Sequence, residues 1–399
     1  MRGNLILLVL PMTLLASCGK SNSITSSNNE DTSQSAISNI ITVEDGIGRS
    51  LTLDTKKIKK VICVGAGALR YYAYLEGAER LVGVEDIDCK SKRNASSPFE
   101  GVARPYYDAY KEEFSSLPTC GQGGPMHQSP ELEKIAALSP DLIISDYERE
   151  EQASSMESSS GAKVFTVKYG QKGVFDDIFT NTLIALGKIL GKESRAHELS
   201  SYISSCKEEI SSKTSSYEHN KKAYIGGVGN WGQKDYLSTH PNYPPFKVAN
   251  ITNVLEREEL ASSGVQNIDK EKFAEIGENI DTLILDSAGI FKTISAYSED
   301  DTIFDNVKAV KNGEVYLQLP YNAYYQNIEI NLMNTYFVAN AVYPDCFGTD
   351  FSMETKADEI LEKFVGKKIY SSLKTMSGQY GGYQKIANLK EFLNNGAKQ

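Results

Sequence analysis

The sequence predicts an α/β protein of two lobes, each with a mainly parallel sheet flanked by helices. Short apolar runs alternate with stretches of helical periodicity, which is the pattern of parallel strands joined by crossover helices. This alternation occurs twice, before and after a helical stretch, and we place the lobe boundary near residues 170–195. The chain has 399 residues, 40% of them hydrophobic, which is enough for two or three domains.

Residues 1–17 have the composition of a secretory signal peptide. One positive charge, Arg2, precedes an apolar run from 5 to 15. This run is too short to cross a bilayer, which needs about 20 apolar residues. Residues 15–18 (Leu-Ala-Ser-Cys) resemble the bacterial lipobox, and the resemblance implies that Cys18 is acylated and begins the mature protein. The alternative is an ordinary signal peptide with a coincidental cysteine.

Residues 18–40 are predicted to be a flexible tether, because Ser, Asn and Thr dominate them and little apolar surface is available to bury. An acylated cysteine followed by such a tether would hold the folded body at a bacterial membrane, outside the cytoplasm. We expect this lipid anchor to be the only attachment to the membrane, since no other run reaches 18 apolar residues.

The first lobe is predicted to span 41–172 and to open with a hairpin, in which 40–43 and 50–53 flank a turn-rich connection. Apolar runs predict buried strands at 60–64, 81–84, 141–145 and 164–167. Helical spacing predicts helices at 69–75 and 131–138.

The helical stretch begins at 174, where apolar residues recur at helical spacing as far as 190, and Gly191 is a plausible stop. A second helix is predicted from Ser194 to about 216. The α/β alternation then resumes in a lobe that spans 193–399. Its predicted strands and helices are 223–228, 270–276, 282–286, 314–317 and helical segments from about 328.

Several segments carry a resemblance to a known family when they are taken in order. Two of them are 138–144 (Leu-Ser-Pro-Asp-Leu-Ile-Ile) and 307–316 (Val-Lys-Ala-Val-Lys-Asn-Gly-Glu-Val-Tyr); the others are 41–53, 59–64, 78–84, 132–135 and 188–193. Together they resemble the substrate-binding proteins of bacterial ABC importers, in the class that binds iron complexes (siderophores, haem) or cobalamin. The resemblance covers about residues 41–390.

The resemblance implies that one long, rigid interlobe helix, residues 173–192, joins the lobes and allows only small hinge motion. It implies partners as well, an ABC permease dimer with its cytoplasmic ATPase. One glutamate on each lobe would meet arginines of the permease, and Glu133 and Glu271 match these by position. Residues 276–281 depart from the Pro-Asp expected before the strand, which weakens the match at Glu271. We expect a monomer with no cofactor of its own.

Ligands of open α/β sheets bind beyond the carboxyl ends of the strands, and the candidate ligand-binding residues are in loops of that kind. They are Arg70, Arg104, Tyr106, Tyr107, Trp231, Tyr324 and Tyr325. Arginine provides a planar donor fork for anions, and aromatic rings suit flat ligands. The alternative roles are salt bridges for the arginines and lobe-core packing for Trp231.

Arginines with aromatic residues suit an anionic metal chelate such as a ferric siderophore. Cobalamin, haem, and an oxyanion such as molybdate or tungstate stay open as alternatives. The four histidines show no i, i+4 pairing, which argues against direct capture of a free metal ion.

Composition and missing motifs argue against other classes of protein. A net charge of -10 disfavours nucleic-acid binding. The chain lacks Gly-x-Ser-x-Gly, the phosphate-binding Gly-x-x-x-x-Gly-Lys-Ser/Thr loop and His-Glu-x-x-His, so we expect no enzymatic activity. A secreted α/β enzyme and a structural lipoprotein are the alternatives. Cys89 and Cys120 flank the same loop region, and whether they pair is left open.

Overall fold

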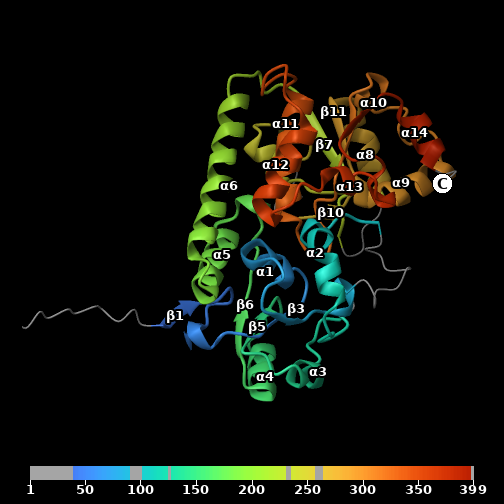
Figure 1. Cartoon of the computed structure of the whole chain (residues 1–399). Coiled ribbons are helices and arrows are strands. Elements are labelled where there is room, and N and C mark those ends of the chain that lie inside the picture. Colours follow the sequence, from blue (N-terminus) through green and yellow to red (C-terminus); the bar gives the residue numbers. More distant parts are fainter. Residues whose placement is uncertain (1–38, 90–100, 125–126, 231–234, 257–263, 397–399) are drawn as a thin grey trace, which may run out of the picture. The chain divides into compact units, whose positions relative to one another are not determined.

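The computed structural model describes residues 39–89, 101–124, 127–230, 235–256 and 264–396 (Figure 1). The predictions for the signal peptide, for residues 18–38 of the tether, for Cys18 and for Trp231 lie outside these residues. Ile40, predicted to end the tether, is already in a strand. In the described part of the chain, no helix is long and apolar enough to cross a membrane.

The first element is the predicted hairpin, which the structure confirms. Strands β1 (Ile40–Glu44) and β2 (Ser50–Asp54) pair antiparallel, with Val43 opposite Leu51. The turn is held by the Asp45 carboxylate, which accepts hydrogen bonds from the backbone N–H groups of residues 47 and 49. The Arg49 guanidinium donates to the Val164 carbonyl at 2.7 Å, which ties the hairpin to the first sheet.

The first lobe is built on a four-stranded, fully parallel sheet in the order β4-β3-β5-β6. The strands are β3 (Val61–Val64), β4 (Leu81–Gly83), β5 (Leu142–Ser145) and β6 (Lys163–Thr166). Every residue of β3 and β5 is buried, as expected for strands covered on both faces. The helices are α1 (Ala68–Glu76), α2 (Pro105–Ser115), α3 (Leu132–Ala137) and α4 (Glu150–Ser160).

Two helices follow the first sheet. Helix α5 (Asp177–Leu190) begins at the Asp176 cap and ends at Gly191, whose φ of 71° is readily adopted by glycine. Helix α6 (Glu193–Thr214) packs against it, and a Cβ added at Gly187 would lie 2.8 Å from the Ala196 Cβ. The predicted stop at Gly191 is confirmed.

Helix α6 has partners in both lobes (Figure 1). Near its start, Arg195 Nε donates to the Tyr74 carbonyl of α1 at 3.2 Å. Near its end, Ser211 Oγ donates to the Val248 carbonyl of the second lobe at 2.9 Å. The predicted linking segment 173–192 contains α5. Because α6 contacts both lobes, the connection between the lobes extends beyond residue 192. That 173–192 is the rigid linking helix, with only small hinge motion between the lobes, stays a prediction.

The second lobe has a five-stranded sheet in the order β13-β12-β11-β7-β9, parallel except for β13. Its strands are β7 (Lys222–Gly226), β9 (Thr252–Asn253), β11 (Thr282–Asp286), β12 (Val315–Gln318) and β13 (Gln384–Ile386), and β8 (Ser238–Thr239) pairs separately with β10 (Gln266–Asn267). Its helices are α7 (Pro244–Val248), α8 (Lys270–Ile276), α9 (Ile290–Glu299), α10 (Lys308–Lys311), α11 (Ile328–Val342), α12 (Met353–Val365), α13 (Tyr370–Leu373) and α14 (Leu389–Gly396).

Short 3-10 turns complete the chain: η1 (Thr55–Lys57), η2 (Asp86–Asp88), η3 (Gly173–Phe175), η5 (Gly277–Asn279), η6 (Ser287–Gly289) and η7 (Ser377–Gln379). The predicted fold class, two α/β lobes with mainly parallel sheets, is confirmed.

Helix α11 is buried on nearly all sides, since it lies among α6, α7, α12 and the second sheet. Its apolar residues belong to the main core. It also carries buried polar residues, Glu329, Asn331 and Asn334, which hydrogen-bond to neighbouring segments. A helix fixed in this way holds the loop that precedes it, residues 321–327, in a defined position.

The burial pattern of α5 gives the first prediction. Leu186 is completely buried, so Leu186→Ala should lower the free energy of unfolding by about 2–5 kcal/mol. Ile178 on the same helix is 43% exposed, and Ile178→Ala should change it by less than about 1 kcal/mol. Urea denaturation measures both variants, and equal losses would contradict the packing described for α5.

Candidate functional site

Loops of both lobes meet beyond the carboxyl ends of the first sheet. In the first lobe, Gly65 follows β3, Glu85 lies two residues beyond β4, and Asp146 follows β5. The 321–327 loop of the second lobe, which lies between β12 and α11, contacts these segments. This is the place at which open α/β sheets bind ligands.

Arg70 lies in the first turn of α1, and its guanidinium is fully buried against the 321–327 loop. It donates to the carbonyl of Ala323 at 3.0 Å, to that of Tyr324 at 3.4 Å and to Asn327 Oδ1 at 3.0 Å. It also donates to the Tyr169 hydroxyl at 3.3 Å. A ligand could reach this guanidinium only after the loop moves, and ligand contact by Arg70 stays a prediction.

Arg104 is also fully buried, and it contacts several residues of the first lobe. It pairs with Asp88 at 2.7 Å and donates to the Tyr106 hydroxyl at 3.1 Å. Its guanidinium lies 4.5 Å from the centre of the Tyr107 ring. The Tyr106 ring also lies under Arg70, at 4.7 Å. The structure therefore brings these four candidate residues together in one buried layer.

Glu85 joins three loops through one carboxylate. Its Oε1 accepts from the Gly65 N–H at 3.0 Å and from the Tyr147 hydroxyl at 3.4 Å. Its Oε2 accepts from the Tyr324 hydroxyl of the second lobe at 2.8 Å. Burial raises the pKa of Glu85 to about 7, and the charge of Asp88 also raises it.

The 321–327 loop is fixed at its base from within the second lobe. Asp286, which ends β11, accepts from the Tyr321 N–H at 2.8 Å and from Gln318 Nε2 at 3.0 Å. Burial raises the pKa of this carboxyl to about 7. Asn327 Nδ2 donates to the Pro320 carbonyl at 2.9 Å and to the Ala103 carbonyl of the first lobe at 3.1 Å.

Among the candidate ligand-binding residues that the structure describes, Tyr325 is the most exposed to solvent. Its side chain is 36% exposed, and its ring lies 4.6 Å from that of Tyr169. Nearby, Asp146 has a buried Oδ1 for which the described residues provide no hydrogen-bond donor. Burial raises the pKa of Tyr325, and the nearby Asp146 and Glu148 carboxylates raise it further. An aromatic face of the second lobe is thus close to carboxylates of the first.

The remaining site predictions fall elsewhere. Glu133 on α3 and Glu271 in the first turn of α8 are both exposed, one on each lobe. The Cys120 thiol points at the Cys63 carbonyl, and that of Cys89 at the Ser115 carbonyl; both are thiols in this structure.

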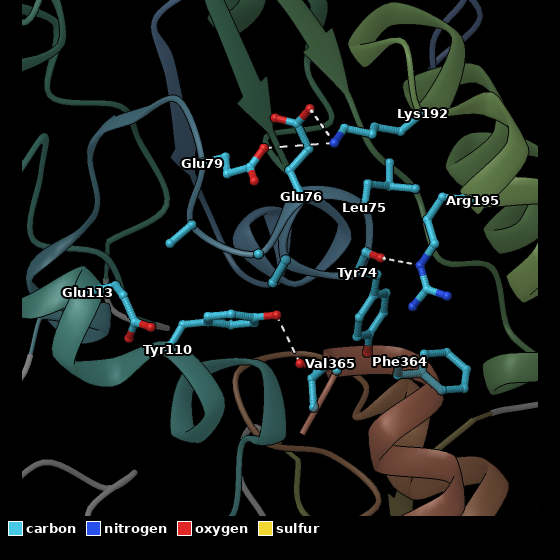
Figure 2. A pocket seen from close by; sticks show the side chains of 14 residues that line it. Tyr74, Leu75, Glu76, Glu79, Tyr110, Glu113, Lys192, Arg195, Phe364 and Val365 are labelled. Atoms are coloured by element: carbon cyan, nitrogen blue, oxygen red, sulfur yellow. Dashed lines mark hydrogen bonds and ion pairs between the residues drawn. The ribbon is translucent and has the colours of Figure 1, made fainter. Parts of the chain in front are cut away.

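A hollow of about 590 Å³ lies at the other end of α1, where the lobes also meet (Figure 2). Figure 2 shows Lys192 directed at Glu76 and Glu79, with both N–O distances 3.8 Å. Tyr110 donates to the Val365 carbonyl of α12 at 2.8 Å. Residues of both lobes line the hollow, so it is a second place at which the lobes meet.

The strand-end residues of both lobes are mostly buried and hydrogen-bonded to one another. In the described residues, no three His, Cys, Asp or Glu side chains come close enough to hold a metal ion. What the site offers is hydrogen-bond donors and acceptors together with aromatic faces.

Comparison with known proteins now places the chain in a family. The model of the periplasmic binding protein family matches residues 97–320, more than half of the chain. The chain belongs to that family. Proteins of this kind bind solutes outside the cytoplasm and work with an ABC permease and its ATPase. No curated protein matches the sequence.

Solved structures of such proteins share the fold. A periplasmic solute-binding protein of Veillonella parvula has a TM-score of 0.64 at 19% identity, covering 85% of this chain and 96% of its own. The molybdate-binding MolA of Haemophilus influenzae gives 0.60 at 16% identity, with 82% and 98% covered. The catecholate-siderophore-binding VctP of Vibrio cholerae gives 0.51 at 18%, with 76% and 98% covered.

Sequence analysis missed three residues of the binding protein's strand-end site: Glu85, Asp146 and Asn327. Glu85 follows the predicted strand 81–84 and Asp146 follows the predicted strand 141–145. The rule that pointed to Arg70 could therefore have found both, but in a chain with 52 acidic residues they did not stand out. Asn327 gave no signal, because its role depends on contacts across the lobes.

The raised pKa of Glu85 predicts a pH dependence of stability. The unfolded carboxyl titrates near 4.5 and the folded one near 7, so the folded protein binds the extra proton between these values. Stability should therefore fall as pH rises through this range. In Glu85→Gln this decrease in the free energy of unfolding should be smaller than in the wild type, by on the order of 1–3 kcal/mol.

Urea denaturation at pH 5, 6, 7 and 8 measures this difference. Asp286 contributes equally to both proteins, so the comparison isolates Glu85. An identical pH profile in the variant and the wild type would show that Glu85 is ionised throughout this range.

Proposed function

We propose that this protein is the substrate-binding component of an ABC importer, and that it captures a metal-containing small molecule between its lobes and delivers it to the permease. The observation that carries the proposal is the convergence of loops from both lobes at the strand ends, in a chain of the periplasmic binding protein family. The protein itself catalyses no reaction.

A ferric siderophore or related iron chelate is the substrate we propose first, with cobalamin, haem, molybdate or tungstate as alternatives. VctP binds a catecholate siderophore and MolA binds molybdate, so the fold accepts both kinds of ligand. Two features of this chain favour a chelate with an organic part. Tyr325 presents an aromatic face to solvent, and the two arginines are already bonded within the protein.

Cys18 is proposed to carry lipid, so that the segment after it tethers the folded body to a bacterial membrane, outside the cytoplasm. The protein would stay mobile there while remaining near its permease. Glu133 and Glu271 are proposed to contact permease arginines, because each is exposed on a different lobe. Arginine on the permease would suit both carboxylates.

A thermal-shift screen tests the substrate class. The purified protein is heated with ferric siderophores, haem, cobalamin, molybdate, tungstate and divalent metal ions. A ligand at 100 times its dissociation constant should add about 2.7 kcal/mol to the stability of the folded state. We expect a ferric chelate to raise the melting temperature. Tyr325→Ala should lower the affinity for this chelate at least tenfold.

Phe291→Ala is the matched control, since Phe291 is another exposed aromatic residue of the second lobe, 72% accessible. It should leave the shift unchanged. Stabilisation by an oxyanion alone would indicate that the substrate is an oxyanion. If no compound stabilised the protein, the proposed substrates would be contradicted.

Charge reversal tests the docking residues. Glu133→Arg and Glu271→Arg should each reduce substrate-dependent stimulation of the permease ATPase at least tenfold, because two cationic groups would then face each other. Ligand affinity should stay the same. The controls are Glu151→Arg and Glu299→Arg, which change exposed glutamates of other helices. If all four variants lose stimulation equally, the effect is one of net charge and not of docking.

A further inference from the structure

The Tyr324 hydroxyl lies in a polar position that the first lobe builds. It donates to Glu85 Oε2 at 2.8 Å and accepts from the Gly124 N–H at 2.9 Å. A hydroxyl group is suited to this position, because it can donate to a carboxylate and accept from an amide at the same time. Tyr324 belongs to the second lobe, whereas both of its partners belong to the first.

The position is shaped independently of Tyr324. Glu85 is 3% exposed and is oriented by the Gly65 N–H and the Tyr147 hydroxyl, all within the first lobe. Gly123 has φ 66°, and a Cβ there would lie 2.7 Å from Glu85 Oε2. A side chain at residue 123 would therefore fill the space beside the carboxylate. The first lobe thus holds a formed acceptor and donor at the ends of its strands.

The occupant is held under strain. Tyr324 and Tyr325 have φ of 49° and 72°, a left-handed conformation that two successive tyrosines rarely adopt. Such a backbone conformation is unfavourable and persists only where other contacts impose it. Here the contacts are the hydrogen bonds from Arg70 to Ala323, Tyr324 and Asn327. The loop is therefore stabilised by the first lobe and strained within itself.

We propose that Glu85 and Gly124 form a hydroxyl-binding site for the substrate, and that Tyr324 occupies this site in the substrate-free protein. The substrate class is a small molecule that presents a phenol or alcohol hydroxyl. Its hydroxyl replaces that of Tyr324, and the 321–327 loop leaves the first lobe as the substrate enters. This inference rests on the proposed function, since it concerns the same strand-end site.

Chemical rescue with 4-methylphenol tests the site, because this molecule is a tyrosine side chain without its backbone. Tyr324→Ala should create a vacancy, so 4-methylphenol should raise its melting temperature. It should not raise the melting temperature of the wild type, in which Tyr324 fills the site, or that of Tyr325→Ala. Toluene has the same shape without the hydroxyl, and we expect it to bind Tyr324→Ala at least tenfold more weakly.

Equal stabilisation by toluene and 4-methylphenol would show that the site recognises only an apolar ring and would overturn the proposal. Equal effects of 4-methylphenol on the wild type and Tyr324→Ala would overturn it as well. If Tyr324→Ala does not fold, Tyr324→Phe provides the test, since it keeps the ring. Amide exchange at Gly124 should then be at least tenfold faster than in the wild type, and an unchanged rate would contradict the proposal.

The panel of siderophores, haem, cobalamin, oxyanions and metal ions separates this inference from the proposed function. Hydroxyl-bearing compounds that stabilise the wild type should bind Tyr324→Ala at least tenfold more tightly, because no side chain competes. Weaker binding would show that Tyr324 is a substrate contact and not a competitor. If no compound of the panel stabilised the wild type but 4-methylphenol stabilised Tyr324→Ala, the proposed substrates would be rejected and the hydroxyl site would be supported.

Discussion

The buried guanidinium of Arg70 is the constraint on which the interface between the lobes depends. A charge removed from water must find hydrogen-bond acceptors, and an unsatisfied one is costly. Most of its acceptors are in the second lobe: the carbonyls of Ala323 and Tyr324 and the amide oxygen of Asn327. Arg70, together with Asp286 at the base of the 321–327 loop, fixes the position of this loop and with it the Tyr324 hydroxyl.

A second set of contacts joins the lobes at the other end of α1. Arg195 of α6 and Tyr74 of α1 meet there, and Tyr74 also donates to Glu329 of α11. Near them, Tyr110 of α2 reaches the Val365 carbonyl of α12. The two sets differ in kind. The contacts at the last turn of α1 involve helices, whereas those at the strand ends involve a strained loop.

The sequence was informative where burial leaves a periodic pattern. The apolar runs at 60–64 and 282–286 predicted β3 and β11, and helical spacing predicted α5. Helix α4 was not predicted because only Ala153 and Met156 are buried in it, so no apolar face is visible. For the candidate site, the strand-end rule pointed to Arg70 and Tyr324. It could not show that they contact each other, since they are 254 residues apart in the chain.

All nine residues of α1 are buried, which gives this short helix a mechanical role. It is about 13 Å long and cannot bend or rotate without disturbing the core on every side. Its first turn carries Arg70 and its last turn carries Glu76, which lines the hollow between the lobes. The strand-end site and the hollow are therefore carried by one rigid element, so a displacement of either end of α1 would move the other.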